Sequence, residues 1–189
     1  MIDTKETARA LYGLWRLARW DEEAFSFFNA TEQGFWRSFA AAAFVAPLQA
    51  LYQLSLYLTL DDPPLIWRVA AIESIEYIIL WTLFPLSMLY VVKLLERETE
   101  FFRYIVAYNW FQLAVGYVAM PFVILSQFQL LPVQVSGFFD SLIFVTYVTF
   151  AAFIARVGLK VGMGASAGIV VIDILLTLMV GQVTLRMLT

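Results

Sequence analysis

The sequence predicts an all-α fold: a bundle of five transmembrane helices preceded by an amphipathic, interfacial helix at the amino terminus. Five apolar stretches fall at 35–60, 65–94, 103–131, 134–157 and 163–185. Each is long enough to cross a hydrocarbon core of about 30 Å, which takes about 20 residues. Hydrophobic residues make up 62% of the chain and charged residues 14%, against about 25% charged residues in soluble domains.

The chain therefore divides into two parts, a surface segment over residues 1–34 and a membrane domain over 35–189. We expect a helix capped by Thr4, with apolar residues at spacings of three and four on one face (Leu11, Leu14, Trp15 and Ala18). Basic residues that would meet anionic headgroups are Arg9, Arg16 and Arg19. Asp21 offers a second cap. The alternative is a cytoplasmic helix packed beneath the bundle. The charges interrupt any apolar core, so a signal peptide is not expected.

Three of the expected spans contain a proline, namely Pro47, Pro85 and Pro121. Proline removes a backbone hydrogen bond and can kink a helix, while neighbouring helices satisfy the freed carbonyl. We expect kinks that shape the bundle; the alternative is a broken-helix transport site. The sequence shows no internal repeat, which argues against an inverted-repeat transporter.

Acidic residues inside the spans are the most informative polar positions. Glu73 and Glu76 lie three residues apart and share a face of the second span, and Asp173 lies near the middle of the fifth. A charge there costs at least about 2.5–3.5 kcal/mol, so these side chains should face the protein interior. Asn109 and the shallower Asp140 complete the polar candidates.

Three roles are open for the acids. They could be structural, hydrogen-bonded to polar neighbours (Gln53, Ser74, Asn109, Gln112 or Gln182). They could form a path for protons or cations. They could also dock a partner subunit.

The sequence contains no cysteine and no histidine. Disulfides, thiolate metal sites, histidine-ligated haem and histidine general bases are therefore excluded within this chain. Nothing pairs a nucleophile with a positioned base, so we expect no enzymatic activity, no cofactor and no metal site. We also expect no nucleic-acid partner.

Gly164 and Gly168 form a small-xxx-small pair at the start of the fifth span. Small residues allow close approach of helix backbones. We expect this pair to pack within the molecule, with the seam of a homo-oligomer as the alternative.

Basic residues predict the orientation, because cytoplasmic loops carry more of them. Ten of the twelve lie before the first span, between the second and third, or between the fourth and fifth. The amino terminus is then cytoplasmic, and five spans place the carboxyl terminus outside. Membrane lipids are thus expected partners, and the location expected is a bacterial inner membrane.

This topology, together with the stretch Arg103-Tyr104-Ile105-Val106-Ala107-Tyr108 and the later Gly116-Tyr117, resembles the Yip1 family of small five-span membrane proteins. The resemblance implies a non-enzymatic membrane protein and assigns a role to no individual residue. We accordingly expect a membrane scaffold or accessory protein that acts through helix and lipid contacts. The alternative is a small proton- or cation-coupled transporter or channel that uses the acids of the spans.

The bias of basic residues gives a test of topology. A reporter that is active only outside the cytoplasm, fused after Thr189, should be active in cells. A reporter that works only in the cytoplasm should be silent at the same position. The opposite pattern would contradict five crossings and would indicate an apolar stretch that does not cross.

Overall fold

The computed structural model describes residues 4–188. The first three residues of the expected surface segment, and Thr189 at the reporter junction, lie outside the described residues. Every regular element in the described part is a helix, and no strand occurs there. The predicted all-α class is confirmed.

Five helical segments are long and apolar enough to cross a membrane, as predicted: Glu32–Leu58, Ile66–Leu94, Glu98–Gln127, Val133–Gly158 and Met163–Leu188. The first combines α2 (Glu32–Ser38) and α3 (Ala40–Leu58), and the third begins with the short η2 (Glu98–Glu100). The remaining helices are α4 (Ile66–Leu94), α5 (Phe101–Gln127), α6 (Val133–Gly158) and α7 (Met163–Leu188). The expected boundary at 34/35 falls inside α2, because Thr31 caps that helix by accepting a hydrogen bond from Gly34 N.

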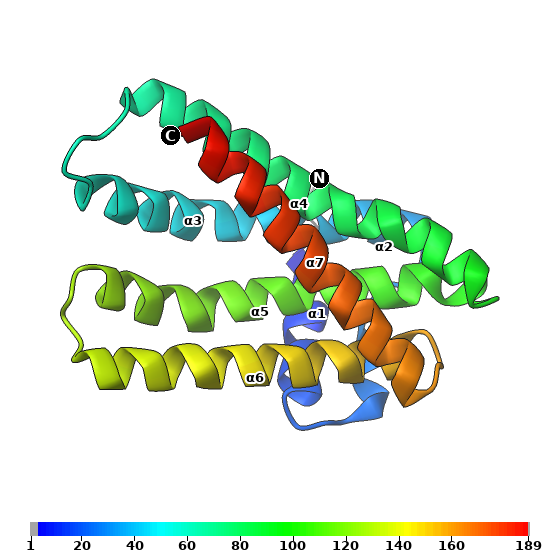
Figure 1. The fold of residues 1–189 in the computed structure, drawn as a ribbon. Helices are drawn as coiled ribbons and strands as arrows, with labels where there is room; N and C mark the ends of the chain where they lie inside the picture. Colours follow the sequence, from blue (N-terminus) through cyan, green and yellow to red (C-terminus); the bar gives the residue numbers. More distant parts are fainter. Residues whose placement is uncertain (1–3, 189) are drawn as a thin grey trace.

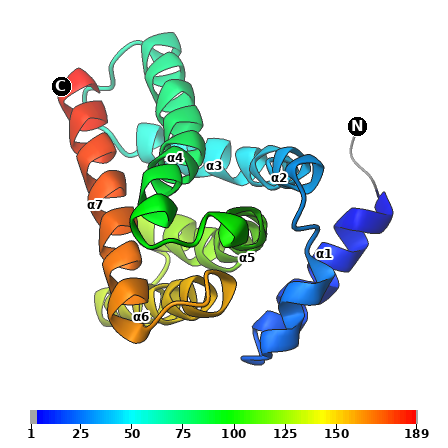
Figure 2. The same ribbon diagram turned by 90° about the vertical axis from the view of Figure 1, so that its right-hand side faces the viewer.

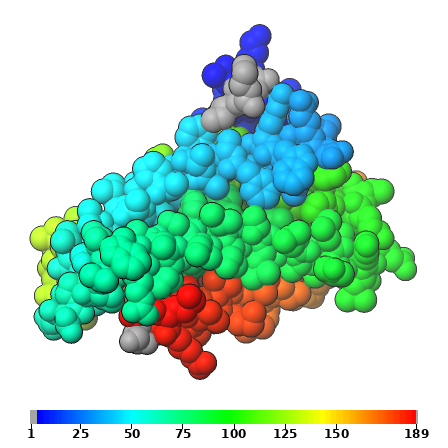
Figure 3. All heavy atoms as spheres, turned by 90° about the horizontal axis from the view of Figure 1, so that it is seen from above, coloured from blue at the N-terminus to red at the C-terminus, as the bar shows by residue number. Residues whose placement is uncertain are grey.

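Helix α5 is the centre of the bundle. It lies between α3 and α6, while α4 and α7 cover one side of this row and α7 crosses both α4 and α6 (Figure 1, Figure 2). From above, α4 runs between α3 and α7 (Figure 3). Every residue from 104 to 111 is buried. A helix that is buried on all sides is surrounded by other elements, which is the position that α5 occupies.

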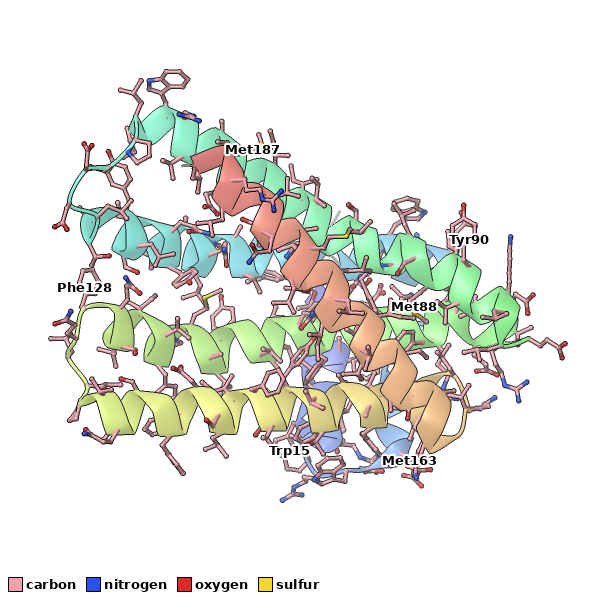
Figure 4. All side chains as sticks on the ribbon, in the orientation of Figure 1. Trp15, Met88, Tyr90, Phe128, Met163 and Met187 are labelled. Carbon is pink, nitrogen blue, oxygen red and sulfur yellow. The ribbon has the colours of Figure 1, made fainter. Side chains whose placement is uncertain are left out.

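The outer surface of the bundle is apolar. Met88 is fully buried, whereas Tyr90, two residues later on α4, is 77% exposed. Figure 4 shows these two side chains leaving α4 in different directions. Large exposed side chains also include Leu51 on α3, Ile78 on α4 and Leu175 on α7. An extended apolar surface of this kind fits a lipid environment.

The helices continue through Pro47, Pro85 and Pro121. The broken-helix alternative is therefore not found at these prolines. Around Pro47, hydroxyl groups from neighbouring helices brace the backbone: Tyr77 donates to Ala42 O at 2.6 Å and Tyr117 to Phe44 O at 3.2 Å. Both bonds go to carbonyls adjacent to that of Ala43, the group that Pro47 leaves without its helical donor.

Several helices end in a tight turn built on a residue with positive φ. Such residues are Trp20, Glu96, Gln129 and Lys160. In each case the next amide donates to the carbonyl five residues back, as Arg97 N does to Val92 O at 2.8 Å. This is the helix-ending pattern that usually employs glycine. It keeps the connections short and so makes consecutive helices antiparallel.

Helix α1 (Thr4–Leu17) lies across the bundle and packs against α5 and the 3₁₀ helix η1 (Glu22–Phe27) (Figure 2). Its most buried residues are Ala10, Gly13 and Leu17. The apolar face expected at the lipid surface is a different one: Leu11, Trp15 and Ala18 are exposed, and Leu14 is partly buried. The helix thus has one face packed on protein and a second apolar face left outside. Asp21 does cap η1, since its side chain accepts from Glu23 N at 2.9 Å.

The expected internal packing of Gly164 and Gly168 is wrong. A Cβ atom added at either position would meet no heavy atom within 4 Å. The close approaches occur elsewhere: a Cβ at Gly116 would lie 3.1 Å from Val45 of α3, and one at Gly158 would lie 3.1 Å from Phe25 and Tyr104. Helix α7 turns its Ser166 side inward instead and leaves its glycine side uncovered.

This contrast predicts the stability of two matched variants. Gly116→Leu should lower the melting temperature of the detergent-solubilised protein by at least about 3 °C, because overpacking costs about 1–3 kcal/mol. Gly168→Leu makes the same chemical change on the uncovered side of α7 and should leave the melting temperature of the monomer unchanged. Thermal unfolding of both variants measures the difference. Equal loss in the two would contradict this packing.

Candidate functional site

The most buried acid of the bundle, Asp173, lies on α7 with 4% of its surface exposed. Both of its carboxylate oxygens accept hydrogen bonds. Tyr108 of α5 donates to Oδ1 at 2.9 Å, and Tyr147 of α6 donates to Oδ2. Gln112, one turn beyond Tyr108, donates to the Tyr108 hydroxyl at 2.6 Å. One carboxylate therefore links three helices.

The Asp173 cluster lines an open cleft of about 430 Å³ bounded by α3, α4, α5, α6 and α7. Asn109 also lines it. The side-chain amide of Asn109 donates to Ser38 Oγ at 2.8 Å, but its Oδ1 is buried without a hydrogen-bond partner. Asn109 therefore joins α5 to α2, not to an acid.

Glu73 lies on α4, where its carboxylate accepts a hydrogen bond from Gln53 of α3. Both residues line a separate cleft of about 460 Å³ between α3 and α4. Glu76 is close to Glu73, and its Oε1 lies 3.9 Å from where a Cβ of Gly181 on α7 would be. Of the polar neighbours expected for these acids, Gln53 is thus a partner, whereas Ser74 donates to Ala70 O in its own helix.

The structure brings these polar groups near one another without joining them. Gln49 and Tyr77 line both clefts, so the two spaces are adjacent. The hydrogen bonds of Glu73 and Asp173 belong to different helix pairs. Asp140 lies apart from both, exposed on α6. Glu73 and Glu76 on the one hand, and Asp173 on the other, therefore belong to two neighbouring polar sites.

Other polar contacts between distant helices follow the same pattern. Arg68, at the start of α4, donates to Met187 O near the end of α7 at 2.7 Å. Gln127, at the end of α5, donates to Thr59 Oγ1 after α3 at 2.9 Å. At the other end, Lys160 pairs with Glu100 at 2.6 Å. Side-chain hydrogen bonds of this kind are the usual polar links between helices in apolar surroundings.

The basic residues expected at the lipid surface have different environments. Arg16 pairs with Glu23 at 2.9 Å and with Asp21, and these hydrogen bonds raise the pKa of its guanidinium above the ordinary value. Arg16 therefore holds the turn that follows α1. Arg19 lies over the Trp15 ring, 4.1 Å from its centroid, and Arg9 contacts Ser26 O at 3.5 Å. Of the four side chains expected at the lipid surface, Arg9, Trp15 and Arg19 are exposed, whereas Arg16 is partly buried.

Sequence reasoning missed Tyr108 and Tyr147, which hold Asp173. Both lie in aromatic stretches that read as apolar, and only their hydroxyl groups make them polar. The spacing of Tyr108 and Gln112, four residues apart on one helix face, was the available signal.

The chemistry of the site is that of hydrogen-bonded carboxyl, phenol and amide groups. Among residues 4–188, no group of three or more acidic side chains is placed to hold a metal ion. No family model matches the chain, and neither a curated protein nor a solved structure matches it. The geometry of these residues is therefore the basis on which a function is assigned.

Proposed function

We propose that this chain is a multi-pass protein of a bacterial inner membrane, with a cytoplasmic amino terminus, that serves as a non-enzymatic scaffold or accessory protein. It acts through contacts of its helices with other membrane components and with lipid. The resemblance to the Yip1 family supports the same reading at the level of topology.

The observation that carries this proposal is the use of the interior acids. Asp173 ties α7 to α5 and α6, and Glu73 ties α4 to α3. A carboxylate with hydrogen-bond donors from neighbouring helices stabilises one arrangement of the bundle. Groups engaged in this way have a structural use that needs no transported ion.

The surface supplies the contacts that a scaffold requires. On α7, Gly164 and Gly168 are uncovered and share a helix face with the exposed Val171 and Leu175. Small residues on an exposed helix face permit close approach of a second helix. A copy of this chain or another membrane subunit is the partner that fits this face.

A second candidate function is proton- or cation-coupled transport. One specific observation favours it: Glu73 and Glu76 are close together, and Glu73 lines an open cleft with Gln49 and Gln53. Interior carboxylates beside a polar space are typical of ion pathways. The adjacent cleft at Asp173 and the unpaired Oδ1 of Asn109 would extend such a path.

Flux measurements on proteoliposomes separate the two functions. Under an imposed potential, the wild-type protein should pass protons, Na⁺ and K⁺ no faster than protein-free liposomes, because the acids act as links. Glu73→Gln and Asp173→Asn should give the same result, with Asp140→Asn on the exposed side of α6 as the matched control.

Transport would be established, and the scaffold function overturned, by a different pattern. The wild type would show flux, Glu73→Gln or Asp173→Asn would abolish it, and Asp140→Asn would retain it. The melting temperature of each variant shows that lost flux is not lost folding. Mass spectrometry of protein and lipid retained after purification in mild detergent then identifies what the scaffold contacts.

A further inference from the structure

A polar pocket of about 450 Å³ lies between the first half of α1, the segment that follows η1, and α2. Three basic residues line it, Lys5 and Arg9 from α1 and Arg37 from α2, together with one acid, Glu6. Their formal charges give the pocket an excess of two positive charges. Lys5 and Arg9 are four residues apart, so they share a helix face, and both are exposed.

Glu6 holds two other side chains of the pocket, Arg37 and Asn29, in position. Its Oε2 accepts from Arg37 Nη1 at 2.6 Å, and its Oε1 accepts from Asn29 Nδ2 at 2.9 Å. The Arg37 side chain nevertheless keeps 33% of its surface exposed. One carboxylate thus fixes the direction of the guanidinium while leaving part of it accessible.

The turn below the pocket is rigidly built. Thr31 donates to Asn29 Oδ1 at 2.8 Å and accepts from Gly34 N at 3.1 Å. A Cβ atom at Gly34 would lie 1.9 Å from Asn29 O, so only glycine allows this turn to close on α2. The Asn29 amide, and with it Glu6, is held in place by the local fold, which makes the pocket preorganised.

The pocket lies at the depth of lipid headgroups in the proposed membrane orientation. Arg37 is 21 residues before Leu58, the last residue of α3, which corresponds to about 32 Å of helix and matches a hydrocarbon core of about 30 Å. Trp36, next to Arg37, is 67% exposed, and tryptophan is enriched at this boundary.

We propose that this pocket binds a phosphate group that carries net negative charge, as found in the headgroup of an anionic phospholipid or in a soluble phosphate. Lys5 and Arg9 supply exposed cations, and Arg37 supplies a guanidinium whose direction Glu6 fixes, which suits phosphate oxygens. This inference deepens the proposed function, since it names the lipid chemistry that the scaffold recognises.

Binding to the full-length protein in neutral detergent tests the proposal, because no membrane surface potential contributes there. The probes are dioctanoylphosphatidylglycerol, dioctanoylphosphatidylcholine and inorganic phosphate, and thermophoresis measures affinity. Phosphatidylglycerol should bind more tightly than phosphatidylcholine. Lys5→Gln with Arg9→Gln should weaken phosphatidylglycerol binding at least about tenfold, because hydrogen bonds between charged groups are stronger than neutral ones. Both residues are exposed, so the melting temperature should not change.

The matched control is Arg19→Gln with Lys93→Gln, which removes two exposed cations outside the pocket and should preserve the affinity. Binding of inorganic phosphate with the same dependence on Lys5 and Arg9 would support the site and assign it to a soluble phosphate; binding of lipid alone would assign it to a headgroup. Equal loss in the control pair, or no loss in the Lys5 and Arg9 pair, would overturn the site. Neither result depends on ion flux. A negative binding result would therefore reject the phosphate site alone, and a positive flux result would reject the scaffold function alone.

Discussion

The buried Asp173 carboxylate imposes the strongest constraint on this fold. An isolated charge among apolar helices is costly, so its surroundings must supply donors. Tyr108 and Tyr147 do so from α5 and α6. Because these donors are on different helices, satisfying the carboxylate also fixes how α7 crosses the bundle. Helix α5, on which α3 and α6 pack, supplies one of these donors (Figure 1).

In the proposed scaffold, the interior of the molecule holds the helices together, and its surface is available for contacts with other membrane components. Polar side chains are turned inward, where they join helices, as Gln53 and Glu73 join α3 to α4. The outward faces are apolar, and the uncovered glycine side of α7 is among them. The amino-terminal segment is different, because α1 packs on α5 with Ala10 and Leu17 buried, while its Lys5 and Arg9 line the pocket at Arg37. Helix contact and anion recognition are therefore located at separate places on the chain.

Apolar length was enough to predict the five long helices, because each must satisfy its own backbone hydrogen bonds. The interior position of Asp173 was also predicted, because a charged side chain facing lipid costs free energy. The partners were less accessible to prediction. In the sequence, Tyr108 and Tyr147 belong to apolar stretches, and only the position of α7 in the structure shows that their hydroxyl groups bind Asp173. Likewise, Gly116 and Gly168 look alike in sequence, and only the crossing geometry shows which one meets another helix. The face of α1 that packs on protein was not predicted, because Gly13, not a larger apolar residue, marks its contact with Phe27 and Phe28.

The central claim is that hydrogen bonds to Asp173 hold the bundle together, and a double-mutant cycle tests it most directly. Tyr108→Phe, Asp173→Leu and the double variant are unfolded reversibly in lipid bilayers, and the coupling free energy is taken from the four stabilities. We predict a favourable coupling of about 0.6–1.7 kcal/mol, the range found for hydrogen bonds between membrane helices. A coupling of zero, with each variant as stable as the wild type, would contradict the account.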